Sequence, residues 1–230
     1  MKPSTEANEI KEVCRKSSSR RQTRLMLIAS GMLWLLLVCG GLGALWSYES
    51  APGVAANPPS RLPADSGIQP ASGQATLVML VHPHCPCTRA SIGELALVMA
   101  QTQGRVKAYV LFLKPQGFSD EWAKSDLWES ATAISGVTAI EDTDGTKARR
   151  FHAATSGQTF LYDARGNLLF SGGITAARGH SGDNAGRSSI VSLVTGGEAA
   201  QTETAVYGCE LFNKNSECRM GEMNHAPGSH

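Results

Sequence analysis

The N-terminal part of the chain contains a long segment without charge, and this segment most constrains what the chain can form. Residues 25–46 include no Asp, Glu, Lys or Arg and are dominated by Leu. As a helix that rises about 1.5 Å per residue, such a segment spans a hydrocarbon layer of about 30 Å. A cleaved secretory signal would have a shorter apolar core of roughly 7–15 residues. We therefore predict a transmembrane helix over residues 25–46.

Basic residues are distributed unevenly on the two sides of this segment. Residues 11–24 contain a cluster of Lys and Arg, whereas residues 47–80 contain only Arg61. Because basic residues are enriched on the cytoplasmic side of membrane helices, residues 1–24 are predicted to be a cytoplasmic tail. The chain would then cross an inner membrane once and expose its C-terminal part to the periplasm.

The remainder of the chain changes in composition along its length. Residues 47–74 are rich in Pro, Gly, Ala and Ser and predict a flexible linker. Residues 75–198 are long and apolar enough for one domain, and residues 199–230 are predicted to form a C-terminal tail. With 21 basic and 20 acidic residues, the net charge of +1 gives no reason to expect a nucleic-acid partner.

Two cysteines lie at the junction between a predicted strand and a predicted helix. The apolar run 76–81 is followed by His82-Pro83-His84-Cys85-Pro86-Cys87, and residues 91–100 then show helical spacing of apolar residues. Unpaired N–H groups and the helix dipole at such a corner favour thiolate over thiol. This pattern predicts redox or metal chemistry on sulfur.

The order of the predicted elements continues from this corner. We expect strands over 76–81 and 107–113, a short apolar stretch over 136–140, and a hairpin formed by 159–163 and 168–173. Helices are expected over 91–100, 119–134, 146–152 and 188–194.

This order, with a Cys motif at the first corner, resembles the thioredoxin-like superfamily and most nearly its membrane-anchored periplasmic TlpA and cytochrome-maturation branch. The residues that carry the resemblance are Cys85-Pro86-Cys87 and the segment 159–166. It implies an α/β fold in which a mixed sheet is flanked by helices. Two features depart from the family pattern. The motif is Cys-x-Cys instead of Cys-x-x-Cys, and Gly157-Gln158 stands where the family has a cis-proline.

The resemblance implies thiol–disulfide exchange, a reaction that requires no cofactor. Cys85 would be the more exposed sulfur and would attack, and Cys87 would release the mixed disulfide. Pro86 would fix the turn between them, and His84 would stand where the attacking Cys falls if the motif is aligned on Pro86-Cys87. The partner would be an exported protein with cysteines, such as an apocytochrome or a copper-site subunit.

The same residues allow a second interpretation. His82, His84, Cys85 and Cys87 combine imidazole and thiolate groups, which are suitable ligands for Cu(I). This alternative resembles copper-delivery proteins of the thioredoxin fold. A structural disulfide or two unreactive thiols would be the simplest interpretation of the pair.

Two further regions are candidates for the site. The Gly-rich loop 172–187 would place Arg178 or His180 near the thiolate of Cys85, with Asp183 orienting the imidazole. Cys209 and Cys218 would form their own disulfide in the C-terminal tail. Alternatively, Cys209 would attack a Cys85–Cys87 disulfide and pass the oxidation to Cys218.

Overall fold

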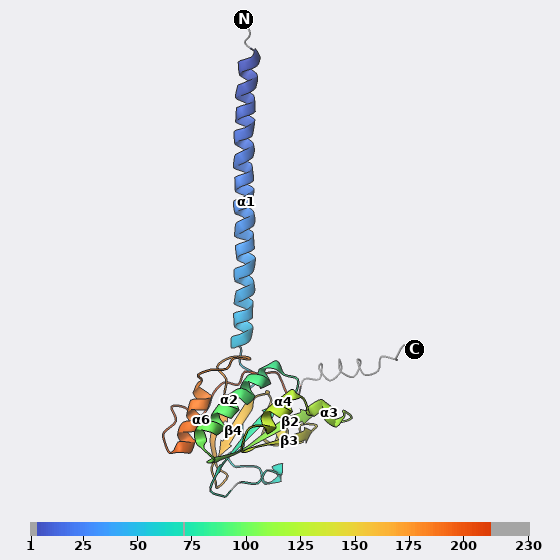
Figure 1. Cartoon of the computed structure of the whole chain (residues 1–230), viewed down its shortest axis with the longest axis vertical. Coiled ribbons are helices and arrows are strands. Elements are labelled where there is room, and N and C mark those ends of the chain that lie inside the picture. The colour runs from blue at the N-terminus through green and yellow to red at the C-terminus, as the bar shows by residue number, and fades with distance from the viewer. Residues whose placement is uncertain (1–3, 71, 213–230) are drawn as a thin grey trace, which may run out of the picture. The chain divides into compact units, whose positions relative to one another are not determined.

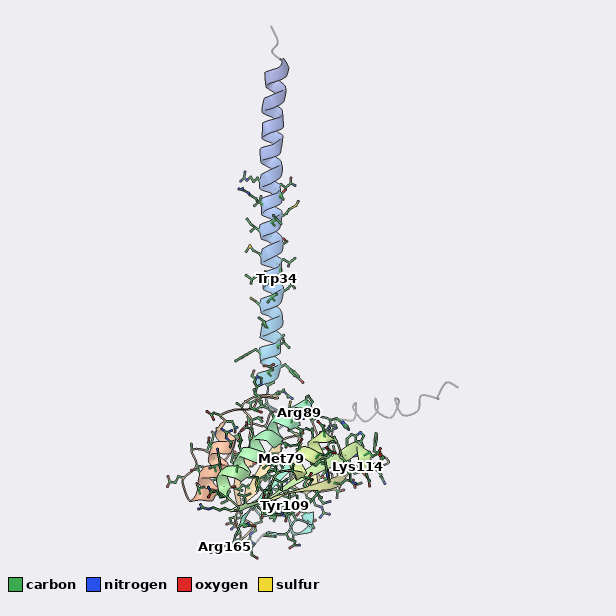
Figure 2. The ribbon with its side chains drawn as sticks, viewed as in Figure 1. Trp34, Met79, Arg89, Tyr109, Lys114 and Arg165 are labelled. Carbon is green, nitrogen blue, oxygen red and sulfur yellow. The ribbon has the colours of Figure 1, made fainter. Side chains whose placement is uncertain are left out.

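A computed structural model describes residues 4–70 and 72–212 of the chain, which divides into two units. The first unit is built on one long helix, α1 (Ser4–Ser50). Its side chains from residue 21 onward are almost all exposed, including Trp34, which is labelled in Figure 2. The stretch Arg21–Ser50 contains a window with a mean hydropathy of 2.2, long and apolar enough to cross a membrane. This helix includes the predicted span 25–46.

The second unit is organised around a five-stranded mixed sheet (Figure 1). Its strands are β1 (Ala75–Val81), β2 (Val106–Lys114), β3 (Val137–Thr143), β4 (Gln158–Tyr162) and β5 (Leu168–Gly172). They lie in the order β3-β2-β1-β4-β5. The pairs β1–β2 and β2–β3 are parallel, whereas β4 is antiparallel to both β1 and β5.

Helices cover the sheet on both faces. They are α2 (Pro86–Thr102), α3 (Asp120–Ala123), α4 (Asp126–Thr132), α5 (Thr146–Arg150) and α6 (Ala185–Thr195), preceded by the short 3-10 helix η1 (Ala64–Ser66). Because successive side chains of a strand point to opposite faces, Leu77 and Met79 of β1 pack with α2, α4 and α6. Val78 and Leu80 pack with α5 on the other face. Met79 lies in the middle of the domain in Figure 2.

This arrangement is the thioredoxin-like fold, so the predicted fold class is confirmed. A strand–helix–strand unit (β1, α2, β2) is followed by further helices, an antiparallel hairpin (β4, β5) and a last helix, α6. The direction of β1 positions the candidate site, since its C-terminal end leads directly to Cys85 and the start of α2.

Two predicted elements differ from the structure. The single helix expected over 119–134 is wrong, because the chain forms α3 and then α4 with a break at Lys124, whose φ and ψ are −85° and 57°. Ser125 begins α4, and its carbonyl accepts the N–H groups of Trp128 and Glu129. The short stretch expected over 136–140 extends to Thr143, because it pairs with β2 along its whole length.

The segments on either side of the predicted domain also pack against it, although we expected a flexible linker and a tail. Before β1, Ile68 is buried, and the N–H of Leu62 donates to the carbonyl of Gly166 at 2.8 Å. After α6, the N–H of Ser171 donates to the carbonyl of Thr202 at 2.9 Å, and Leu211 is buried in the core. These apolar side chains find places on the sheet that the local composition does not reveal. Cys218 lies outside the described residues.

Candidate active site

The centre of the candidate site is Cys85, which caps the N-terminus of α2. Its backbone is extended, with φ −82° and ψ 121°, and Pro86 occupies the first helical position. Proline suits that position because its missing N–H would have no partner within the helix. The N–H of Cys85 donates to the carbonyl of His82 at 3.1 Å, and the N–H of Thr88 donates to the carbonyl of Cys85 at 3.0 Å. The corner between β1 and α2 is therefore a defined turn.

A hydroxyl from the loop before β4 fixes this corner. The Oγ of Ser156 accepts the backbone N–H of His82 at 2.9 Å and lies 3.0 Å from Oγ1 of Thr88. Oγ1 of Thr88 in turn lies 3.1 Å from the carbonyl oxygen of His82. Ser156 and Thr88 are both buried, so these hydrogen bonds are sheltered from water. They hold the start of α2 against the loop 154–157.

The sulfur of Cys85 contacts a cysteine from the far end of the chain. Its Sγ lies 2.9 Å from the Sγ of Cys209. The hydrogen bond from the Cys209 side chain lowers the pKa of Cys85 to about 5, opposed by burial and assisted by the backbone N–H groups of Cys209, Cys87 and Thr88. Two of those N–H groups belong to the first turn of α2, as expected for a thiol at a helix N-terminus. Cys85 is therefore a thiolate at neutral pH.

Cys87 has the opposite character. Burial raises its pKa, and the negative charge of Cys85 raises it further. The positive charge of Arg178 and the backbone N–H of Gly179 act in the other direction without reversing the shift. Of the two motif cysteines, only Cys85 is prepared to attack.

The expectation that Cys85 is the more exposed sulfur is wrong. Cys85 is 2% exposed and Cys87 is 8% exposed. Neither belongs to the two apolar clusters of the core. The cover over Cys85 includes Cys209, which belongs to a segment that is not part of the sheet. Cys85 is therefore shielded from solvent, although it packs in neither apolar cluster.

The two histidines of the motif form an aromatic cluster with Trp122. The ring centroids of His82 and His84 lie 5.4 and 4.8 Å from that of Trp122, and both contacts are edge-to-face. The Nδ1 of His82 also accepts the backbone N–H of His84 at 3.2 Å. Burial lowers the pKa of His82, so its ring is neutral near pH 7. These contacts position the rings against the indole.

The same geometry bears on the copper interpretation. Within residues 4–70 and 72–212, no three side chains of His, Cys, Asp or Glu are grouped in a way that could hold a metal ion. His82, His84, Cys85 and Cys87 are neighbours in sequence, but they do not converge on one point in this conformation. The donor set predicted for Cu(I) therefore does not fit as placed.

The loop before α6 contributes one of its three predicted residues to the site. Arg178 acts electrostatically on Cys87 and Cys209, and its guanidinium donates to the carbonyl of Gly208. His180 is placed elsewhere, with Nδ1 2.9 Å from the carbonyl oxygen of Arg178 and Nε2 4.0 Å from Glu49. Asp183 pairs with Arg187 at 2.7 Å and does not orient an imidazole. The expected support by His180 and Asp183 is therefore absent from the described site.

Gly157 stands where the family pattern has a proline, and its backbone makes a hydrogen bond that proline could not make. Its φ is 89°, a conformation that favours glycine, and its N–H donates to the carbonyl of Leu80 at 2.7 Å. Proline has no N–H and could not make this hydrogen bond. No peptide bond in the described part of the chain is cis. The loop 154–157 is thus tied to the end of β1 by its backbone.

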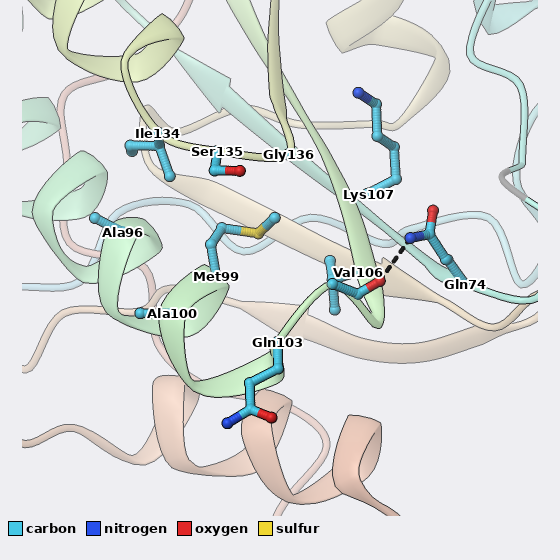
Figure 3. Close-up of a pocket in the computed structure, with 11 residues that line it drawn as sticks. Gln74, Ala96, Met99, Ala100, Gln103, Val106, Lys107, Ile134, Ser135 and Gly136 are labelled. Carbon is cyan, nitrogen blue, oxygen red and sulfur yellow. Dashed lines mark hydrogen bonds between the residues drawn. The ribbon is translucent and has the colours of Figure 1, made fainter.

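A surface pocket of about 550 Å³ lies at the opposite end of the sheet from Cys85 (Figure 3). It is bounded by the end of α2, the start of β2 and the turn before β3, with Met99, Val106 and Ile134 among its lining residues. The lining residues include no Cys, His, Asp or Glu. The pocket therefore offers no thiol or imidazole, and the candidate sulfur chemistry stays at the Cys85 corner.

The sequence did not indicate Ser156, and it left the role of Cys209 open. Cys209 was expected either to pair with Cys218 or to attack a Cys85–Cys87 disulfide in a relay. The only signal for Cys209 was the even number of cysteines beyond the membrane segment, which does not identify partners. Ser156 gave no signal, because a single serine before a strand is common.

Comparisons with known proteins support the fold. No protein-family model matches the chain, and no curated protein matches it. A hypothetical protein from Sinorhizobium meliloti 1021 has a similar structure, with a TM-score of 0.53 and 19% identity over 71% of this chain and 97% of that one. An uncharacterized conserved protein from Geobacillus kaustophilus matches with a TM-score of 0.52 and 18% identity over 72% of this chain and 93% of that one.

A third solved structure is a secreted Mycobacterium tuberculosis disulfide oxidoreductase homologous to E. coli DsbE, with a TM-score of 0.34 and 19% identity over 42% of this chain and 67% of that one. A likeness of that size carries no argument about function. The two likenesses with TM-scores above 0.5 support the fold described above, and the chemistry has to be argued from the site.

Proposed function

We propose that this chain is a membrane-anchored thiol–disulfide oxidoreductase that uses Cys85 as its attacking thiolate. The observation that carries the proposal is the environment of Cys85, whose pKa is lowered to about 5 by a hydrogen bond from Cys209 and by backbone N–H groups. A thiolate is the species that attacks a disulfide sulfur, and its position at a helix N-terminus keeps it ionised at neutral pH.

The reaction begins when the Cys85 sulfur attacks one sulfur of a substrate disulfide. A mixed disulfide forms, and the other substrate sulfur leaves as a thiolate that takes up a proton. A second thiol of the protein then attacks the Cys85 sulfur and releases the substrate. The Cys-x-Cys motif assigns this second role to Cys87.

The apolar stretch of α1 and the basic residues that precede this stretch support a location for this chemistry. In the proposed arrangement, α1 anchors the chain in the inner membrane, the N-terminus lies in the cytoplasm and the domain lies in the periplasm. Disulfides persist in that compartment. The partner is then an exported protein with cysteines, such as an apocytochrome or a copper-site subunit.

The test uses the full chain in detergent micelles. Equilibration in glutathione buffers of stepped ratio, followed by alkylation and mass spectrometry, measures the reduction potential of the protein thiols. A defined two-electron transition, together with reduction of a small disulfide such as dithionitrobenzoate, supports the proposal. Cys85→Ser should abolish the activity, and Ser130→Ala, on the exposed face of α4, should leave it unchanged.

The same detergent-solubilised protein is used to test the copper-binding alternative. Reduced protein is titrated with Cu(I) against a coloured chelator that competes for the metal. Tight binding of one Cu(I) per chain without disulfide turnover would favour the metallochaperone function and contradict the proposal.

A further inference from the structure

The C-terminal segment 206–211 docks as an extra strand-like piece beside the loop 154–157. The N–H of Ser156 donates to the carbonyl of Cys209 at 2.8 Å, and the N–H of Leu211 donates to the carbonyl of Ala154 at 2.8 Å. Thr155 and Glu210 form an antiparallel bridge between these hydrogen bonds. The segment is therefore held in register against the same loop that fixes the Cys85 corner.

The approach of this segment depends on Gly208. A Cβ atom at Gly208 would lie 1.9 Å from the carbonyl oxygen of Ser156, which no side chain tolerates. Val206 and Leu211, on either side of Gly208, are both buried, so the segment is anchored at both ends. This docking determines where the sulfur of Cys209 lies.

The sulfur of Cys209 lies in direct contact with the sulfur of Cys85. The two Sγ atoms lie 2.9 Å apart, and a disulfide bond of about 2.05 Å requires them to approach by only about 1 Å. Cys87 stands in the first turn of α2, and its side chain also hydrogen-bonds to Cys85. Cys209 is therefore an alternative to Cys87 as the thiol that reacts with the Cys85 sulfur.

We infer that Cys209 is the resolving cysteine, which attacks the mixed disulfide on Cys85 and closes a Cys85–Cys209 bond. This inference rests on the proposed thiol–disulfide exchange and changes the role that the motif assigns to Cys87. The Cys209 thiol loses its proton to water, its sulfur bonds to the Cys85 sulfur, and the substrate sulfur leaves as a thiolate that takes up a proton. Overall, two protein thiols are oxidised and one substrate disulfide is reduced to two thiols.

The groups around Cys209 that raise its pKa are lost in part when Cys85 reacts with the substrate. Its hydrogen bond to Cys85 raises the pKa of Cys209, and burial and the charge of the Cys85 thiolate raise it further. The hydrogen bond and the charge disappear when Cys85 is bound to substrate sulfur. The positive charge of Arg178, which lowers the pKa of Cys209, remains. Cys209 thus becomes a better nucleophile only after Cys85 has reacted.

The experiment starts from the full chain with Cys14→Ser, Cys39→Ser and Cys218→Ser, so that only Cys85, Cys87 and Cys209 remain. Reduced protein in detergent is mixed with oxidised glutathione, quenched with acid at intervals, alkylated and mapped by mass spectrometry. We expect a transient glutathione adduct on Cys85, followed by a disulfide between Cys85 and Cys209.

Further single substitutions in this three-cysteine background identify the resolving thiol. Cys209→Ser should prolong the glutathione adduct on Cys85 by about tenfold or more, because it removes a positioned nucleophile. Cys87→Ser should leave the adduct lifetime within about twofold of the background. Gly208→Val, which keeps all three thiols but displaces the segment, should also prolong the adduct. Gly93→Ala, in open space on α2, is the control for a glycine replacement that the fold accepts.

The inference is overturned if Cys87→Ser prolongs the adduct while Cys209→Ser does not, or if the internal disulfide joins Cys85 to Cys87. In either of these two outcomes, an adduct that still forms on Cys85 at the rate of the background protein leaves the proposed function intact. Failure of the background protein with Cys85, Cys87 and Cys209 to form the adduct overturns the proposed function itself, and the inference with it.

Discussion

At the scale of single residues, the site depends on hydrogen bonds that converge from distant parts of the chain. Cys85 receives N–H groups from its own helix, a pattern that the sequence indicates, and a thiol from a residue 124 positions away. Ser156 joins the two regions, since its hydroxyl contacts the corner and its N–H contacts Cys209. The reactivity of one sulfur is thus set by three separate segments.

Replacing Ser156 should therefore weaken the domain as well as the site. Ser156→Ala leaves the N–H of His82 without its acceptor, whereas the hydroxyl of Thr88 keeps the carbonyl of His82, and we expect a cost of about 1–3 kcal/mol in the free energy of unfolding. Urea unfolding of the full chain in detergent, followed by tryptophan fluorescence, measures the change. Ser130→Ala removes an exposed hydroxyl and should change stability by no more than about 0.5 kcal/mol. Equal effects of the two variants would argue against a special role for Ser156.

At the scale of elements, a buried ion pair fixes the loop before α6 to helix α2. Glu94 is 1% exposed and lies 2.5 Å from the guanidinium of Arg187, whose side chain is 11% exposed. The same carboxylate accepts the N–H of Gly182 at 2.7 Å and the side-chain amide of Asn184 at 3.1 Å. The loop that carries Arg178 toward Cys87 therefore has a fixed base.

Removing the charge of Glu94 should be costly. Glu94→Gln removes the buried counter-charge of Arg187 and leaves only the exposed Asp183 to pair with it, so we expect a loss of about 3 kcal/mol in the free energy of unfolding. The matched control is Arg89→Gln, which breaks an exposed ion pair with Asp126 and should cost about 0–1 kcal/mol. Urea unfolding of both variants in the same detergent gives the comparison. A loss for Glu94→Gln no larger than for the control would contradict this account of the loop.

The sequence was sufficient to predict the elements whose pattern is local. The strand before Cys85, the helix after it and the hairpin 159–173 have apolar periodicity and turn residues that indicate their type. The break between α3 and α4 was missed because it depends on tertiary contacts, among them the hydroxyl of Ser125, which lies 3.4 Å from the carbonyl oxygen of Pro83. Long-range docking explains the other failures. The contact of Cys209 with Cys85 and the packing of Ile68 leave no local pattern.

At the scale of the whole chain, the proposed topology has α1 crossing a membrane and the domain outside the cytoplasm. This proposal rests on the apolar stretch of α1 and on the basic residues that precede that stretch. It also matters for the chemistry, because cytoplasmic reductants would keep the protein thiols reduced.

Labelling with a membrane-impermeant maleimide tests this topology in spheroplasts of a Gram-negative host. One full-length variant retains only Cys14, and a second lacks all native cysteines and has Ser72→Cys, an exposed position before β1. We expect the second to be labelled in intact spheroplasts and the first only after lysis. Labelling of Cys14 before lysis, or of position 72 only after lysis, would reverse the orientation.

Cys85 should be ionised at neutral pH, and the rate at which iodoacetamide alkylates it measures this ionisation. Only the thiolate reacts, so the rate should rise with pH through a midpoint at about 5 and be constant above about pH 6.5. Mass spectrometry of the full chain, sampled between pH 4 and 9, follows Cys85 separately from the other cysteines. A midpoint near the ordinary cysteine value of about 8.5 would contradict the account.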